Sequence, residues 1–118
     1  MYNYHCLNAI SNVGLAEFSA DYTAVDQMDQ AQVVLVRSAA MHEMDMPAGL
    51  DAIARAGAGV NNIPLDKCAQ AGVVVFNTPG ANANAVKELV LTGMLVATRN
   101  VIEAANWVQT IKNEEGVA

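Results

Sequence analysis

The chain has 118 residues, of which 53% are hydrophobic and 15% are charged, and its formal net charge at pH 7 is −6. This length suits one domain with a real core but not two, and the high hydrophobicity with few charges excludes a disordered chain. The acidic balance argues against nucleic acid or an anionic membrane as a partner, because both bind basic surfaces.

Strand and helix signals alternate from the N-terminus. Residues 4–8 (YHCLN) predict a short strand, and residues 11–18 predict a short helix with Ser11 as its cap. Residues 22–25 predict a weak second strand. Residues 32–37 (QVVLVR) give the clearest strand, since a β-branched apolar run without alternation is typical of a strand buried on both faces of a parallel sheet.

The middle of the chain predicts two more strands and a well-marked helix. A short helical stretch is predicted over residues 47–50. Residues 52–56 (AIARA) are ambiguous, because their alanines favour a helix whereas their place before a glycine turn favours a strand, which we predict. Residues 64–71 predict a helix that ends at Gly72, and residues 73–77 (VVVFN) predict the fifth strand.

A long helix is predicted from Ala83 to Ile111, followed by a polar tail. Its apolar residues follow steps of three and four, and more apolar residues lie off that stripe. A helix that is apolar on most sides is usually buried on most sides. We therefore expect it to pack against more than its own sheet and to mediate formation of a homo-oligomer.

Alternating strands and helices predict an α/β fold with a doubly wound parallel sheet of about five strands in the flavodoxin-like order. Ligands of such sheets bind outside the carboxyl ends of the strands. Those ends carry Arg37 and Ser38, then Arg55 with the turn 57–59, and then residues 77–82.

Two of the chain's six basic residues, Arg37 and Arg55, fall at this edge. Arginine pairs bidentately with phosphate or carboxylate, and a glycine turn lets backbone N–H groups approach an anion. We predict a site for a ligand with two anionic ends. Other interpretations stay open: surface ion pairs for the arginines, a purely conformational role for Gly57 and Gly59, and a helix cap for Asn82.

The remaining signals favour a soluble, cytoplasmic protein. Cys6 and Cys68 form no C-x-x-C pair, so we expect free thiols, and the isolated His5 and His42 predict no metal site. The N-terminus lacks a secretion signal, and the apolar run 89–98 has about half of the roughly 20 residues that span a bilayer.

The stretch RAGAGVNN (55–62) looks like the start of the dinucleotide fingerprint G-x-G-x-x-G. Asn62 stands where the third glycine belongs, and the next strand ends in Asn77-Thr78 rather than in the acidic residue that the fingerprint requires. We therefore predict that this loop does not bind the pyrophosphate of NAD.

Three stretches together resemble the amino-terminal part of the NAD-dependent D-2-hydroxyacid dehydrogenases: VLVRSA, ARAGAGVNNIPLDKCAQAGVVVFNTPGANANAVKEL and GMLVATRNV. The resemblance covers nearly the whole chain. It implies that residues 1–82 form a flavodoxin-like substrate-binding domain and that residues 83–118 form the interdomain crossover helix with a polar tail. The nucleotide-binding domain is expected outside this chain.

The same resemblance implies that a small, anionic, phosphorylated 2-hydroxy acid is oxidised at its 2-hydroxyl by hydride transfer to NAD. The position of Arg37 would hold the phosphate with Ser38 beside it, and Arg55 would add positive charge. Further positions are implied for the carboxylate (backbone N–H groups around Ala58, Gly59 and Val60), for the nicotinamide (Ala58) and for another substrate contact (Asn82).

Two departures from the family pattern matter. Many members have aspartate at the position of Asn61. The family's catalytic arginine, glutamate and histidine come from later sequence and have no match here, since His5 and His42 stand in the wrong places. We expect a fragment that carries no catalytic residue, does not turn over alone and lacks a closing segment from the carboxyl-terminal region.

Three other classes of protein are alternatives. A receiver-type signalling module needs carboxylates where this chain has Asn8 and Arg37, and a lysine where it has Asn77. A flavodoxin needs a phosphate loop rich in serine and threonine where this chain has residues 9–14 (AISNVG). A stand-alone anion-binding or regulatory domain without catalysis remains the alternative function.

Overall fold

The computed structural model describes residues 1–114 and 116. Part of the predicted polar tail, residues 115, 117 and 118, lies outside the described residues. Contacts divide the chain into two units, Met1–Ala81 and Asn82–Ala118. Each unit is described by itself.

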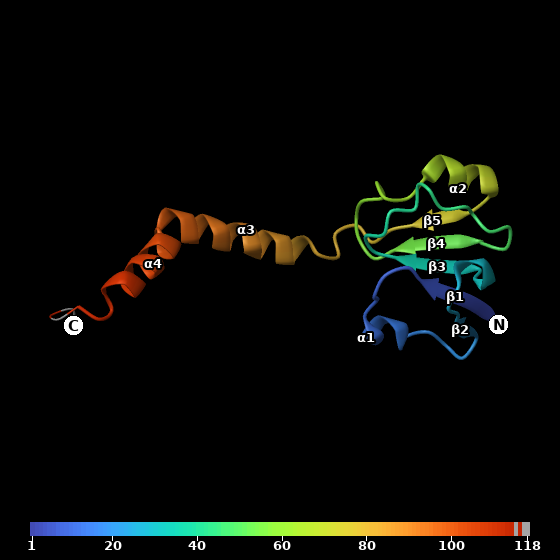
Figure 1. The fold of residues 1–118 in the computed structure, drawn as a ribbon. Helices are drawn as coiled ribbons and strands as arrows, with labels where there is room; N and C mark the ends of the chain where they lie inside the picture. The colour runs from blue at the N-terminus through green and yellow to red at the C-terminus, as the bar shows by residue number, and fades with distance from the viewer. Residues whose placement is uncertain (115, 117–118) are drawn as a thin grey trace. The chain divides into compact units, whose positions relative to one another are not determined.

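The first unit is built on a five-stranded sheet in which every neighbouring pair is parallel (Figure 1). The order β2-β1-β3-β4-β5 is the flavodoxin-like order that the sequence predicts. Residues 52–56 do contribute a strand, so the ambiguity there is resolved as predicted. The strands are β1 (Tyr2–Cys6), β2 (Tyr22–Ala24), β3 (Val33–Val36), β4 (Ala52–Arg55) and β5 (Val74–Phe76).

The helices of this unit are short, and two differ from the prediction. The stretch 47–50 is a single turn and not a helix. One 3.0 Å hydrogen bond, from the N–H of Leu50 to the carbonyl of Pro47, closes it, and four residues have room for no second bond of this kind. The first helix is shorter than 11–18, and Ser11 makes no side-chain cap bond. The helices are α1 (Asn12–Leu15), the 3₁₀ turn η1 (Met28–Gln30) and α2 (Leu65–Ala71).

The predicted end of α2 is confirmed in detail. Gly72 follows the helix with φ +75°, and its N–H bonds to the carbonyl of Ala69. This left-handed conformation is available to glycine without the steric cost that a Cβ brings.

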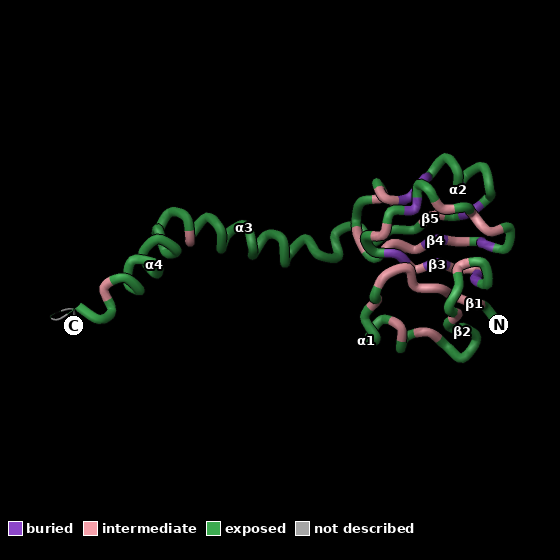
Figure 2. The backbone as a smooth tube through the Cα atoms, viewed as in Figure 1, coloured by how far each residue is buried: buried purple, intermediate pink, exposed green. Residues whose placement is uncertain are grey.

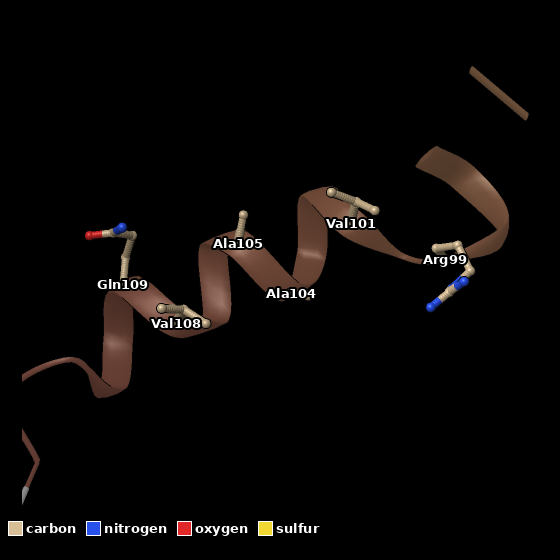
Figure 3. A pocket seen from close by; sticks show the side chains of 6 residues that line it. All are labelled: Arg99, Val101, Ala104, Ala105, Val108 and Gln109. Carbon is tan, nitrogen blue, oxygen red and sulfur yellow. The ribbon is translucent and has the colours of Figure 1, made fainter. Parts of the chain in front are cut away.

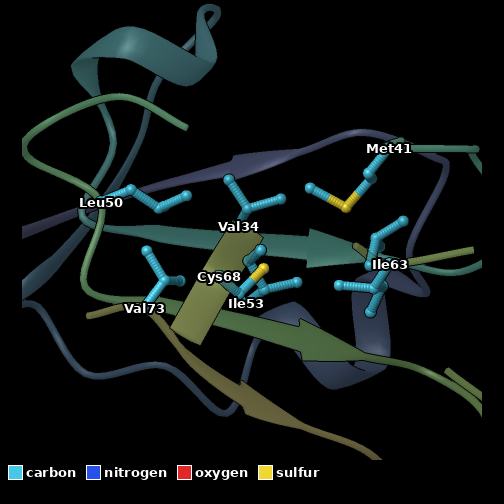
Figure 4. Packing of buried hydrophobic residues seen from close by; sticks show 8 residues of the cluster. Val34, Met41, Leu50, Ile53, Ile63, Cys68 and Val73 are labelled. Carbon is cyan, nitrogen blue, oxygen red and sulfur yellow. The ribbon is translucent and has the colours of Figure 1, made fainter. Parts of the chain in front are cut away.

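The core lies on one face of the sheet, between the strands and α2 (Figures 2 and 4). Val34 and Ile53 pair in register, are fully buried and point into this cluster. The opposite face carries Leu35, Ala54 and Phe76 in register, and the Phe76 side chain is 57% exposed. The expectation of strands buried on both faces is therefore met on one face only. The core comprises Val34, Val36, Met41, Leu50, Ile53, Ile63, Cys68 and Val73.

The second unit contains two helices, α3 (Ala83–Thr98) and α4 (Val101–Ile111), rather than the continuous helix predicted over residues 83–111. Asn100 has φ 50°, the left-handed conformation that asparagine tolerates better than most residues. The Thr98 hydroxyl also donates to the carbonyls of Met94 and Leu95, a pattern that bends helices. None of the described helices combines the length and the hydrophobicity that a membrane-spanning helix needs.

Candidate functional site

The carboxyl ends of the parallel strands bring four segments of the first unit to one edge of the sheet. These are Asn8 after β1, residues 37–42 after β3, residues 56–62 after β4 and residues 77–78 after β5. Main-chain hydrogen bonds join neighbouring chain segments at this edge. The N–H of Ala56 donates to the Val36 carbonyl at 2.8 Å, and the N–H of Thr78 donates to the Gly57 carbonyl at 3.0 Å.

Arg55 joins the two segments that the sequence nominates as an anion site. Its Nε donates to the carbonyl oxygen of Arg37 at 3.0 Å, and its Nη1 donates to the carbonyl oxygen of Gly59. A guanidinium has five N–H groups, so its charge and the other N–H groups remain for a ligand. The structure therefore brings Arg37, Arg55 and the glycine turn together.

The glycines make room for this arginine. A Cβ added at Gly57 would lie 3.1 Å from Nη1 and 3.3 Å from Cζ of Arg55. A Cβ added at Gly59 would lie 3.3 Å from Nη1 and 3.3 Å from the Asn61 side-chain oxygen. Neither glycine has a positive φ. Glycine is therefore required at these positions because a side chain would crowd Arg55, and not because of the backbone conformation.

The carbonyl oxygens of the glycine turn are occupied, and the N–H of Gly57 donates to the Arg55 carbonyl at 2.9 Å, but among the described residues the next three N–H groups are free. The carbonyls of Gly57, Ala58 and Gly59 accept bonds from Thr78 N–H, Asn77 Nδ2 and Arg55. Within residues 1–114 and 116, the N–H groups of Ala58, Gly59 and Val60 donate to no protein acceptor. Ala58 and Gly59 are also exposed. Three successive free donors beside a guanidinium are an arrangement that binds anions.

Asn62 holds the loop after β3 against this turn. Its Nδ2 donates to the Ala39 carbonyl at 2.8 Å, and its own carbonyl accepts from Met41 N–H at 2.9 Å. In the described part of the chain, its buried Oδ1 has no hydrogen-bond partner. Asn62, which stands where the fingerprint has its third glycine, thus makes a structural hydrogen bond that glycine cannot make because it has no side chain.

Arg37 and Ser38 are exposed at the start of the loop after β3. The Asn8 side-chain oxygen accepts their two N–H groups, and that of Ala39, at 3.0 Å each. Among the hydrogen bonds of the described residues, none involves the Arg37 guanidinium or the Ser38 hydroxyl. Both side chains are available to a ligand.

A shallow hollow of about 770 Å³ borders the turn at Val60. Beside it, Nε2 of His42 contacts the Asn61 carbonyl at 2.9 Å, and Lys67 donates to the His42 carbonyl. The hollow is lined by His42, Val60, Asn61, Ile63, Pro64, Leu65, Asp66 and Lys67.

Asn82 belongs to the second unit, where it occupies the N-cap of α3 without a side-chain cap bond. Its predicted substrate contact stays a prediction. A separate hollow of about 580 Å³ lies along α4 (Figure 3). Its lining side chains are mostly small and apolar, and no group of polar side chains converges on it, so it does not have the character of an anion site. It is lined by Arg99, Val101, Ala104, Ala105, Val108 and Gln109.

Metal and thiol chemistry find no support in the described residues. These residues include no group of three or more histidine, cysteine, aspartate or glutamate side chains that could hold a metal ion. Cys6 and Cys68 are free, and burial raises the pKa of both thiols, which disfavours the nucleophilic thiolate.

Sequence reasoning did not foresee the hydrogen bonds by which three asparagines organise the candidate site. Asn8, Asn62 and Asn77 each follow or face a strand end and bind the main chain of a different segment. The available signal was an asparagine directly after an apolar run, which is a common residue of loops and so carries little information alone.

Comparisons with known proteins agree with the fold. Residues 5–115 match the family described as D-isomer specific 2-hydroxyacid dehydrogenase, catalytic domain. A hydroxypyruvate reductase of Thermotoga maritima is 40% identical over 90 residues, which cover 74% of this chain and 28% of that protein. A D-3-phosphoglycerate dehydrogenase of Methanocaldococcus jannaschii is 32% identical over 104 residues, which cover 83% of this chain and 20% of that protein.

A solved structure adds the same likeness in three dimensions. The crystal structure of phosphoglycerate dehydrogenase from Lactobacillus plantarum superposes with a TM-score of 0.52 at 27% sequence identity. The match covers 92% of this chain and 38% of that one. The chain thus spans well under half the length of each of these relatives.

Proposed function

Because the chain belongs to the D-isomer specific 2-hydroxyacid dehydrogenases, we propose that it forms the substrate-binding part of an NAD-dependent oxidoreductase. The proposed substrate is 3-phosphoglycerate, whose oxidation at the 2-hydroxyl would start serine biosynthesis in the cytoplasm. Several relatives, including that of Methanocaldococcus jannaschii, carry the name D-3-phosphoglycerate dehydrogenase.

One observation carries the proposal: the free N–H groups of Ala58, Gly59 and Val60 lie on a turn whose carbonyls are all held by the protein. In this proposal they bind the substrate carboxylate. Charge-assisted bonds from backbone N–H groups to an anion are shorter and stronger than neutral ones. Arg55, already bonded to this turn, adds positive charge beside it.

The second anionic end of the substrate is assigned to Arg37, with Ser38 beside it. The Arg37 guanidinium is exposed, and its planar fork matches a phosphate bidentately. A site with two separate anion-binding groups favours a substrate with a phosphate and a carboxylate. Hydroxypyruvate, suggested by the name of the Thermotoga maritima relative, has only one anionic group.

In this reaction the C2 hydrogen leaves as hydride, the 2-hydroxyl proton passes to a base, and the product is the 2-oxo acid. NAD would supply the hydride acceptor. The residues of this chain would bind and orient the substrate, and Ala58 would lie beside the nicotinamide. The turn does not fit the NAD pyrophosphate, because Asn62 takes the place of the third glycine and bonds to Ala39.

The alternative is a stand-alone anion-binding or regulatory domain, which would not turn over 3-phosphoglycerate with NAD in any longer form. If this chain is part of a complete dehydrogenase, kinetics of that enzyme test the substrate assignment. We expect Arg37→Ala to raise KM for 3-phosphoglycerate by roughly tenfold or more, as expected for a lost charge-assisted bond. The same change should alter KM for hydroxypyruvate little. Arg99→Ala, in the second unit, is the control. Unchanged KM and kcat for 3-phosphoglycerate in Arg37→Ala would contradict the phosphate assignment.

A further inference from the structure

Asn8 makes an unusual set of bonds at the centre of the site's edge. Its single side-chain oxygen accepts the N–H groups of three consecutive residues, Arg37, Ser38 and Ala39, each at 3.0 Å. The converging atom must be the oxygen of the amide, because the nitrogen has no acceptor capacity. The three bonds reach 29 to 31 residues along the chain, so they join the segment after β1 to the loop after β3.

The segment 37–39 is held from two other sides as well. The carbonyl of Arg37 accepts from Arg55 Nε at 3.0 Å, and the carbonyl of Ala39 accepts from Asn62 Nδ2 at 2.8 Å. Its main chain is therefore fixed by three side chains from three different segments. The Arg37 and Ser38 side chains leave this fixed main chain without a described partner of their own.

We propose that Asn8 is a positioning residue of the anion site: by binding the three N–H groups it fixes the main chain from which Arg37 and Ser38 reach the ligand. This rests on the proposed function, in which these two residues bind the substrate phosphate. A loop that is ordered before binding loses less conformational freedom on binding, so its affinity is higher. The role needs an oxygen acceptor at this position and no contact between Asn8 and the ligand.

The test compares Asn8→Ala, Asn8→Asp and Asn3→Ala in the same chain. Asn8→Ala removes the acceptor, and Asn8→Asp keeps one. Asn3 is the control, since it lies on β1, which ends just before Asn8 in the chain, and its amide donates to the Gln30 carbonyl. The measurements are residue-resolved amide hydrogen exchange without ligand and calorimetric titration with 3-phosphoglycerate and with inorganic phosphate.

We expect Asn8→Ala to speed exchange at residues 37–39 by about tenfold, with affinity for both anions lower by roughly fivefold or more. Asn8→Asp should restore slow exchange at these three amides, and Asn3→Ala should leave both exchange and affinity unchanged. If Asn8 had a merely structural role, Asn8→Ala would lower the stability of the whole unit. Amide exchange would then become faster throughout the unit and not mainly at residues 37–39.

The outcomes separate this inference from the proposed function. If the unchanged chain binds both anions and Asn8→Ala binds them equally well, the positioning role is wrong and the proposed function stands. If exchange at residues 37–39 does not respond to Asn8→Ala, the positioning role is wrong whatever the affinity. If the unchanged chain binds neither anion, the proposed function fails, and so does a positioning role for this site.

Discussion

Gly57 shows how a single missing Cβ shapes the site. The Arg55 guanidinium occupies the space that a side chain at Gly57 would need, with Nη1 at 3.1 Å from the position of the Cβ. The far end of an arginine is flexible, so an added methyl group would displace it rather than unfold the sheet. The consequence would fall on the bonds of Arg55 to Arg37 and Gly59.

We therefore predict that Gly57→Ala lowers the affinity for 3-phosphoglycerate severalfold and changes the free energy of unfolding by less than about 1 kcal/mol. Gly49→Ala is the matched control, because a Cβ at Gly49 meets nothing within 4 Å. Calorimetric titration and urea unfolding measure the two quantities. Full affinity in Gly57→Ala would show that the placement of Arg55 does not matter to the anion.

Asn61 and Asn62 are adjacent asparagines with different environments, and this gives a second prediction. Asn62 donates to the Ala39 carbonyl and buries its Oδ1 without a described partner, whereas Asn61 is exposed. Asn62→Asp replaces the donor with an oxygen and buries a carboxylate. We expect it to lower the free energy of unfolding by about 2 kcal/mol or more.

Asn61→Asp should change the free energy of unfolding by less than about 0.5 kcal/mol, since surface substitutions rarely do more. Urea unfolding of both variants at neutral pH makes the comparison. Equal stability of the two would mean that the bond from Asn62 to Ala39 contributes little to the loop.

Among the strands, the face of the sheet on which a side chain lies determines how much it contributes to the free energy of unfolding. Val34 is fully buried on β3, whereas Val74 on β5 is 53% exposed. We predict that Val34→Ala lowers the free energy of unfolding by roughly 2 kcal/mol, from lost apolar burial and a residual cavity. Val74→Ala, the same chemical change, should cost less than about 1 kcal/mol. A similar loss in both would contradict the assignment of the core to one face.

The sequence predicts an element well where residues within that element mark it. The strand VVLV is marked by local β-branched residues, and the end of α2 by Gly72, so both are predictable. The break at Asn100 was missed because the apolar spacing continues through it, although Thr98 and Asn100 are the local residues that produce it.

The location of the candidate site could be predicted from the sequence, but the hydrogen bonds that build it could not. Parallel strands place their carboxyl ends together, so Arg37 and Arg55 could be assigned to one edge from the sequence. The bonds of Asn8 to residues 37–39 depend on which strands are neighbours and on side-chain geometry. Neither the strand order nor the side-chain geometry follows from the residues near Asn8 in the sequence, so these bonds could not be predicted.

At the scale of the whole molecule, the second unit presents a large apolar surface. Neither α3 nor α4 contains a buried residue. We propose that this surface mediates self-association, because exposed apolar surface of this kind marks interaction sites. The large apolar residues exposed on α3 are Val86, Leu89, Val90, Leu91, Met94 and Leu95.

Sedimentation velocity tests this proposal. We expect a concentration-dependent oligomer in the unchanged chain and a shift towards monomer in Leu89→Glu and Leu95→Glu, whose side chains are 73% and 66% exposed. Gln109→Glu on α4 is the control for added charge. A strictly monomeric unchanged chain at high concentration would contradict the proposal.

In the proposed function, this edge of the sheet binds the two anionic ends of a phosphorylated 2-hydroxy acid. The most direct measurement is a ¹H–¹⁵N NMR titration of the chain with 3-phosphoglycerate, glycolate and inorganic phosphate. We expect 3-phosphoglycerate to shift the amides of Ala58, Gly59 and Val60 together with the Arg37 Nε–H, glycolate to shift mainly the three amides, and phosphate mainly the Arg37 signal. Shifts confined to other residues, or no saturable shifts with 3-phosphoglycerate, would contradict it.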